Sequence, residues 1–188
     1  MISPQATLAV FAGRAPRIHP TAFVAPGARL IGDVVVGEGA SIWYNCVIRG
    51  DVNRVEIGPR SNIQDGTVIH CDAPRPDGMP GGRPTLIGAD VLVGHMAMLH
   101  GCTLRDRAFV GLGAIVMDDC EVEGGGMLAA GAMLTPGKRV AGGQLWAGRP
   151  AKHLRDLSEA ELAGHRLGVA HYVENAKAHA AALLAIDA

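Results

Sequence analysis

The sequence predicts an all-β solenoid of stacked triangular coils, followed by a C-terminal α-helix. Three observations predict it: aliphatic residues recur every six positions, 26 of 188 residues are glycine while only 4% are aromatic, and a proline-free, alanine-rich segment ends the chain. A period of six fits neither an α-helix nor a simple alternating strand. It fits a short strand and a tight turn, repeated. We divide the chain into a solenoid, residues 1–144, and a connector with the helix, residues 145–188.

The repeat of six runs along most of the chain, with three interruptions. Three extra residues precede Ile57, a longer insertion precedes Ile87, and one residue is missing before Leu104. We expect the aliphatic side chain to point inward. The fifth residue of each unit, counted from the aliphatic one, is often small and should let the chain turn. Three units close one coil, and stacked coils pair as parallel strands. The repeated aliphatic positions are Ile18, Val24, Leu30, Val36, Ile42, Ile48, Ile57, Ile63, Ile69, Ile87, Val93, Leu99, Leu104, Val110, Val116, Val122, Leu128, Leu134 and Val140.

The segment after Val140 changes character. Residues 145–152 read as a turn-rich connector, and Ser158 with Glu161 forms a capping box, which marks a helix start. We predict a long helix from there to about Ile186. Its apolar residues are expected to pack along the solenoid or on a neighbouring subunit; they are Leu162, Leu167, Val173, Leu183 and Leu184.

Composition excludes several classes of protein. The formal net charge is −1, which argues against a strongly basic nucleic-acid binder. No apolar run approaches the roughly 18 residues of a membrane span, and no basic stretch precedes the short apolar run at residues 8–12, so we expect no signal peptide. The cysteines lack Cys-x-x-Cys spacing and are expected to be buried thiols in a reducing cytoplasm; they are Cys46, Cys71, Cys102 and Cys120.

Two histidines are predicted to stack on one face of the solenoid. His70 follows the inward Ile69 and His100 follows the inward Leu99, and 99 − 69 = 30 residues equals one coil of eighteen plus twelve. The proline- and glycine-rich stretch 72–84 accounts for the twelve as a protruding loop. The two rings should therefore lie one strand spacing apart, about 4.8 Å, and could share a metal ion. The other histidines are expected to be ordinary surface residues; they are His19, His153, His165, His171 and His179.

His95 could join this site only from a second copy of the chain. It lies two residues after Val93, on the preceding face, and should not reach the same ion within one chain. A homotrimer in which the neighbour supplies His95 would complete the site between subunits. Arg49 falls in the column of His70 and His100, and Asp65 falls beside His95, so these two residues could pair across the interface.

At these residues the sequence resembles the gamma-class carbonic anhydrases. The matching elements are Arg49-Gly-Asp51, Asn62-Ile-Gln-Asp65, His70, and the segment from Gly94 to Cys102, together with the connector 146–151 and the helix. The resemblance covers nearly the whole chain. It implies a left-handed β-helix, a trimer and three interfacial sites for zinc, or for iron or cobalt. Implied metal ligands are His70, His95 and His100; implied interface and catalytic residues are Arg49, Asp51, Asn62, Gln64, Asp65 and Tyr172.

The implied reaction is the reversible hydration of carbon dioxide to bicarbonate by a metal-bound hydroxide. Zinc held by three histidines lowers the pKa of bound water to about 7, and Gln64 would position the hydroxide. The chain departs from the family's active prototype at Val52, where the prototype has a glutamate, and in the loop 72–84, which carries Asp72 and Asp77 but no glutamate. These differences leave the proton shuttle in doubt, so the resemblance supports metal binding more strongly than rapid hydration.

Two other functions stay open on the sequence. One is an acyl-transferase or thioesterase that uses coenzyme A thioesters in the same interface cleft, because many acyltransferases share the hexapeptide repeat. The other is a non-catalytic trimeric scaffold with a structural metal. Hexapeptide acyltransferases typically rely on one histidine, so three convergent histidines favour the carbonate dehydratase.

Overall fold

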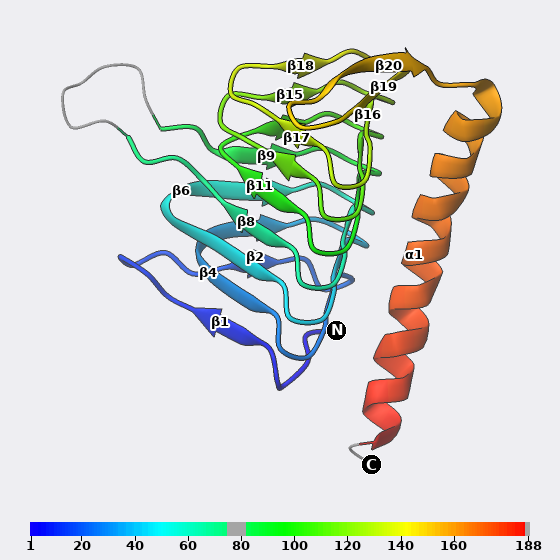
Figure 1. Ribbon diagram of the computed structural model, residues 1–188. Coiled ribbons are helices and arrows are strands. Elements are labelled where there is room, and N and C mark those ends of the chain that lie inside the picture. The colour runs from blue at the N-terminus through cyan, green and yellow to red at the C-terminus, as the bar shows by residue number, and fades with distance from the viewer. Residues whose placement is uncertain (75–81, 187–188) are drawn as a thin grey trace.

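The computed structural model describes residues 1–74 and 82–186, and it confirms the predicted solenoid and helix (Figure 1). Short strands stack in parallel coils to form a three-sided left-handed β-helix, and one long helix lies alongside it. The repeated aliphatic side chains fill the interior: Ile48, Ile69 and Leu99 are completely buried. Small residues at the corners, such as Ala97 and Ala108, are 1% exposed. The residues that recur every six positions are therefore the inward ones, as predicted.

The first side of the prism, which we call the helix face, is a sheet on which the helix packs. Its strands run in parallel except for the last pair. They are β3 (Phe23–Val24), β5 (Ser41–Ile42), β7 (Asn62–Ile63), β10 (Leu92–Val93), β13 (Phe109–Val110), β16 (Met127–Leu128), β19 (Gln144–Ala147) and β20 (Lys152–Asp156).

The other two sides form one continuous sheet, because β4 (Arg29–Val36) and β6 (Val47–Ile57) are long and bend from one side onto the other. The side that we call the apolar face holds β1 (Thr7–Ala9), the first half of β6, β8 (Val68–His70), β11 (Met98–His100), β14 (Ile115–Val116) and β17 (Met133–Leu134). The side that we call the charged face holds β2 (Arg17–Ile18), the second half of β6, β9 (Thr85–Ile87), β12 (Thr103–Leu104), β15 (Glu121–Val122) and β18 (Arg139–Val140).

The connector is more ordered than the sequence indicated. β19 pairs in parallel with β16, so the solenoid continues beyond residue 144, and β20 returns antiparallel to β19. The turns predicted for residues 145–152 are confined to residues 148–151, and strands flank them on both sides. Trp146 explains the difference, because it takes the inward position that an aliphatic residue holds elsewhere and packs against the core.

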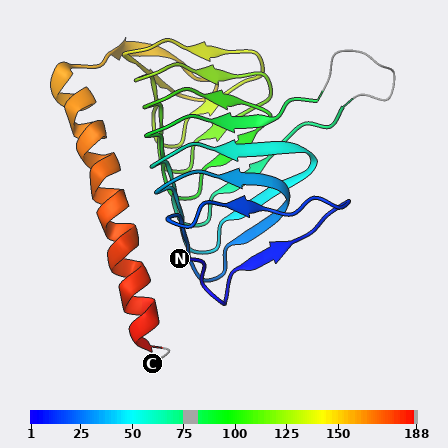
Figure 2. The same cartoon turned by 180° about the vertical axis from the view of Figure 1, so that it is seen from behind.

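Helix α1 (Glu159–Ile186) begins at the predicted capping box. The Ser158 N–H donates to Glu161 Oε2 at 2.9 Å, and the Glu161 N–H donates to Ser158 Oγ at 3.3 Å. The helix runs back along the solenoid and contacts β3, β5, β7 and β10 (Figure 2). Of the predicted packing residues, Leu167 and Leu184 are 72% and 62% exposed and do not pack there.

Two histidines expected at the surface instead help to hold the helix. His179 Nδ1 lies 2.9 Å from the Tyr44 hydroxyl, and its ring packs edge-on against Trp43. His165 packs edge-on against Phe109 at a centroid distance of 4.8 Å. The prediction for these two is wrong because the helix turns these rings toward the sheet.

The four cysteines are free and buried, as predicted. Burial raises the pKa of the Cys46 thiol to about 12, so it stays protonated and unreactive near neutral pH. Within the part of the chain that the structure describes, no helix is both long enough and apolar enough for a membrane crossing.

Candidate metal centre

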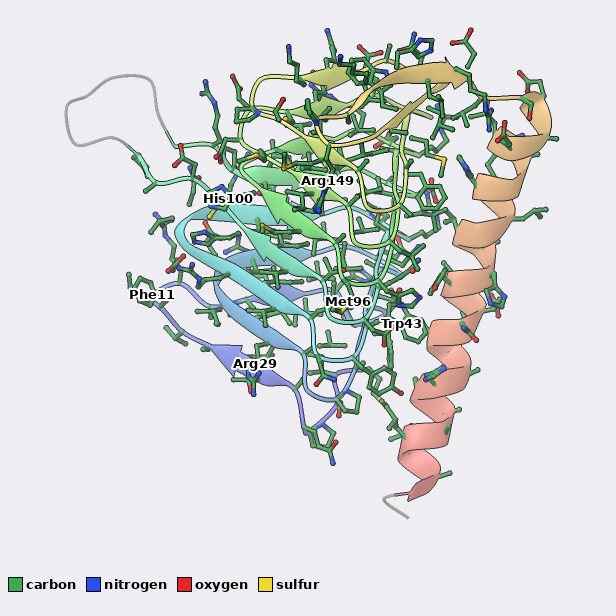
Figure 3. All side chains as sticks on the ribbon, viewed as in Figure 1. Phe11, Arg29, Trp43, Met96, His100 and Arg149 are labelled. Carbon is green, nitrogen blue, oxygen red and sulfur yellow. The ribbon has the colours of Figure 1, made fainter. Side chains whose placement is uncertain are left out.

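His70 and His100 lie side by side at the outer end of the apolar face. Strands β8 and β11 pair in register, with Ile69 opposite Leu99 inside and His70 opposite His100 outside. The two ring centroids are 5.0 Å apart, which confirms the predicted stacking. Figure 3 shows His100 at the end of β11 that lies away from the helix, and Met96 at the opposite end of the same side.

A carboxylate holds the outer nitrogen of each ring. His70 Nε2 donates to Asp51 Oδ1 at 2.9 Å, and His100 Nδ1 donates to Asp118 Oδ1 at 2.5 Å. The inner nitrogens, His70 Nδ1 and His100 Nε2, face each other 3.1 Å apart, and which of them carries a hydrogen depends on the tautomers of the two rings. Two nitrogens that bind one tetrahedral zinc at about 2.0–2.1 Å lie about 3.3 Å apart. When neither inner nitrogen carries a hydrogen, the pair therefore has the spacing to share a cation.

Hydrogen-bond partners stabilise the ionised form of the Asp51 carboxyl. Burial acts to raise the pKa of its carboxyl, but hydrogen bonds from His70 and Arg49 outweigh it, so the pKa lies below its usual range. Arg49 lies in the column of His70, as predicted, because Ile48 pairs with Ile69. Within one chain Arg49 bonds to Asp51; its predicted pairing with Asp65 of another copy stays a prediction.

His95 lies at the other edge of the apolar face, in the corner between β10 and β11. Its Nδ1 lies 2.8 Å from Asp65 Oδ2, which confirms that these residues stack, and the Met96 N–H donates to the Asp65 carbonyl at 2.9 Å. The His95 side chain is 40% exposed. A carboxylate thus holds one nitrogen of this ring as well, and the other nitrogen stays available.

Asn62, Gln64 and Tyr172 belong to the same edge. Gln64 Nε2 donates to Asn62 Oδ1 at 2.9 Å, and both side chains are buried on the helix face. Tyr172, on α1, packs edge-on against Trp43 at 5.4 Å. Burial raises the pKa of the Tyr172 hydroxyl, and the negative charge of Asp65 raises it further.

The predicted residues therefore form two clusters at the two edges of one side of the prism. The histidine-pair cluster comprises Arg49, Asp51, His70 and His100, with Asp118; the corner cluster comprises Asn62, Gln64, Asp65, His95 and Tyr172. Among the described residues of a single copy, no three His, Cys, Asp or Glu side chains are grouped so that they could hold a metal ion. One chain brings two imidazoles together, and His95, the third predicted ligand, lies at the other edge of the apolar face.

Asp118 is the site residue that the sequence reading missed. The register places Met117, not Asp118, above His100, since Leu99 pairs with Val116. The carboxylate reaches His100 from the following corner, so counting along the histidine column, which leads to Met117, gives no signal for it. Of the residues in doubt, Val52 is 39% exposed, and Asp77 lies outside the described residues.

Comparisons with known proteins identify the family. A family described as "Bacterial transferase hexapeptide (six repeats)" matches residues 15–50. Gamma carbonic anhydrase 1 of Arabidopsis thaliana is 44% identical over 180 residues, covering 96% of this chain and 65% of the relative, so the chain spans less than two thirds of that protein. Gamma carbonic anhydrase 3 of the same plant is 42% identical, covering 95% and 69%. Protein YrdA of Escherichia coli K12 is 42% identical, covering 85% and 86%.

Two solved structures share the whole fold. A hexapeptide transferase family protein from Anaplasma phagocytophilum is 46% identical with a TM-score of 0.84, covering 92% of this chain and 97% of that one. A protein from Bacillus cereus titled as a putative acetyltransferase is 35% identical with a TM-score of 0.87, covering 93% and 97%. Because the identity to named gamma carbonic anhydrases exceeds 40% over nearly all of its length, the chain belongs to the gamma carbonic anhydrase family of hexapeptide-repeat proteins.

Proposed function

We propose that the protein is a metal-dependent gamma-class carbonic anhydrase, which hydrates carbon dioxide reversibly to bicarbonate at sites between the subunits of a homotrimer. The observation that carries the proposal is the histidine pair, whose inner nitrogens face each other at 3.1 Å while carboxylates hold the outer ones. His95 of a neighbouring copy would be the third ligand. Zinc suits three imidazoles, with iron or cobalt as alternatives.

The apolar face supports assembly. Its outward residues form one column across five paired strands: Val47, Val68, Met98, Ile115 and Met133. Val68 and Met98 are 44% and 45% exposed, and Met96 in the adjacent corner is 71% exposed. Monomers rarely leave such a contiguous apolar patch in water. The patch lies between the two clusters, so a second copy packed on it would bring its own His95 toward the histidine pair.

The chain's own residues would prepare the reaction. Zinc bound by three imidazoles supplies hydroxide at neutral pH, because it lowers the pKa of water to about 7. Asp51 and Asp118 would hold two of these imidazoles in place. The Gln64 side-chain amide donates to Asn62. Its carbonyl oxygen, Oε1, would then be free to accept a hydrogen bond from the nucleophile. The buried Gln64 side chain would thereby orient the nucleophile toward carbon dioxide.

Proton export is the step that this chain performs least well. Val52 stands where the resemblance places a glutamate, and a valine side chain cannot carry a proton. We therefore expect buffer molecules to accept the proton, so turnover should rise with buffer concentration at constant pH and ionic strength. An unchanged rate across that range would show that the chain has its own shuttle.

The decisive test is complementation between two inactive variants, His95→Ala and His100→Ala. Alone, each should bind little zinc and hydrate carbon dioxide slowly. When the two are unfolded together and reassembled, about one quarter of the interfaces should combine an intact pair with an intact His95, and that share of zinc and activity should return. A site contained within one chain would give no recovery, which would sink the proposal.

Acyl transfer is the second candidate, and similarity to the Bacillus cereus protein described as a putative acetyltransferase favours it. Turnover of an acyl-coenzyme A by the metal-loaded protein, without hydration of carbon dioxide, would establish it. Zinc binding without either activity would indicate the scaffold. In all three cases we place the protein in the cytoplasm, because its four buried free thiols suit a reducing compartment.

A further inference from the structure

We infer that Asp118 is a positioning residue that orients His100 for metal binding; the inference rests on the function proposed above. The His100 ring has two nitrogens, and only one can bind the metal. Its Nδ1 donates to Asp118 Oδ1 at 2.5 Å, so Nε2 is the nitrogen left to face His70. Without that carboxylate the ring could rotate or present the other nitrogen.

The Asp118 backbone is anchored independently of the histidine. The next residue's N–H, from Asp119, donates to the Gly101 carbonyl in the coil below at 2.9 Å. In the coil above, the Gly137 N–H donates to the Asp118 carbonyl at 3.0 Å. Backbone hydrogen bonds to the coils below and above thus hold the corner that carries Asp118. A side chain can orient another only when its own backbone is fixed in this way.

Gly101 makes room for this contact. It directly follows His100 and has a φ of +54°, and a Cβ added there would lie 2.4 Å from Asp118 Oδ1. A side chain at this position would therefore collide with the carboxylate oxygen that holds His100. The corner thus combines a glycine, a histidine and a carboxylate in one arrangement.

Asp118 also completes a pattern. Each of the three candidate ligands contacts its own carboxylate: His70 contacts Asp51, His95 contacts Asp65, and His100 contacts Asp118. Carboxylates in this position fix the ring and make its other nitrogen a better ligand, and their loss typically costs 10–100-fold in metal affinity.

The test measures zinc affinity by competition with a chromophoric chelator, on trimers verified by sedimentation. Asp118→Ala should bind zinc about 10–100-fold more weakly than the unaltered protein. Asp118→Asn, which retains an oxygen acceptor, should recover part of the affinity. The matched control is Asp119→Asn, which removes the same charge at the same corner and tolerates the φ of +59° there; Asp119 is 62% exposed and pairs with Arg83 at 3.0 Å. This control should bind zinc as the unaltered protein does.

Cobalt(II) substitution adds a readout that a purely structural role would not change. The visible spectrum should shift in Asp118→Ala and stay the same in Asp119→Asn. Gly101→Ala should weaken zinc binding as well, although it removes no ligand and no charge. Equal affinities in Asp118→Ala and the unaltered protein, or equal losses in Asp118→Ala and Asp119→Asn, would overturn the inference and leave the proposed function standing. Failure of the unaltered trimer to bind zinc would instead overturn both.

Discussion

The apolar face and the charged face of the prism share one core but present opposite surfaces. On the apolar face the outward column is Val47, Val68, Met98, Ile115 and Met133. On the charged face the corresponding column is Glu56, Leu86, Thr103, Glu121 and Arg139, and ion pairs such as Arg105–Glu121 cross it at 2.5 Å. The repeat thus constrains only inward positions, and the outward positions are free to be apolar on one face and charged on the other.

The largest expected effect is the loss of assembly in Met98→Glu. A buried unpaired carboxylate at the centre of the apolar patch is costly, so we expect monomers that have lost their zinc. The matched control is Thr103→Glu, which lies one residue before an inward leucine of the same coil, on the charged face. It should leave the trimer intact. Sedimentation velocity checks both; a trimeric Met98→Glu would contradict the assignment of the two faces.

A pair of core truncations tests the shared interior. Leu99 and Leu104 are 0% and 1% exposed and point inward from the two faces. Replacement of either by alanine should lower the free energy of unfolding by about 2–5 kcal/mol, because each leaves a cavity. Urea denaturation at one fixed protomer concentration measures both losses. A much larger loss for one leucine would show that the faces differ inside as well as outside.

The helix face depends on α1, and its cap is the next test. Ser158→Ala removes the acceptor for the Glu161 N–H, so we expect a loss of about 1 kcal/mol in stability. Circular dichroism during urea denaturation measures it. The trimer should persist, since the cap lies away from the apolar face. Simultaneous dissociation would mean that the helix, too, is part of the subunit interface.

The smallest effect concerns the titration of Tyr172, which couples the helix to the corner cluster. Tyr44→Phe leaves Tyr172 as the only tyrosine, and absorbance at high pH should then show a pKa above the ordinary 10.0. Asp65→Asn should lower it in part, because burial is the main cause and the charge of Asp65 the second. Since folding raises this pKa, stability should fall as pH rises past 10 through the folded-state value. Tyr172→Phe should reduce that dependence, and the buried cysteines, whose pKa burial also raises, should maintain the rest. A pKa at or below 10.0 would place Tyr172 in water.

Residue spacing and motifs predict the solenoid, its inward residues, the capping box of α1 and the register of the histidine pair. Each follows from distance along the chain: 99 − 69 residues, less the inserted twelve, is one coil, so His70 and His100 must stack. Asp65 came to lie beside His95 by the same counting.

Contacts between segments distant in the sequence are visible only in the folded structure. Asp118 reaches His100 from a neighbouring corner, Gln64 bonds to Asn62 beneath the helix, and His179 meets Tyr44 because α1 docks on one particular sheet. A repeat fixes backbone register, because every coil must bury the same positions. The repeat does not determine the rotamers of outward side chains or the position of the helix. Those depend on contacts between segments that are not related by the six-residue period.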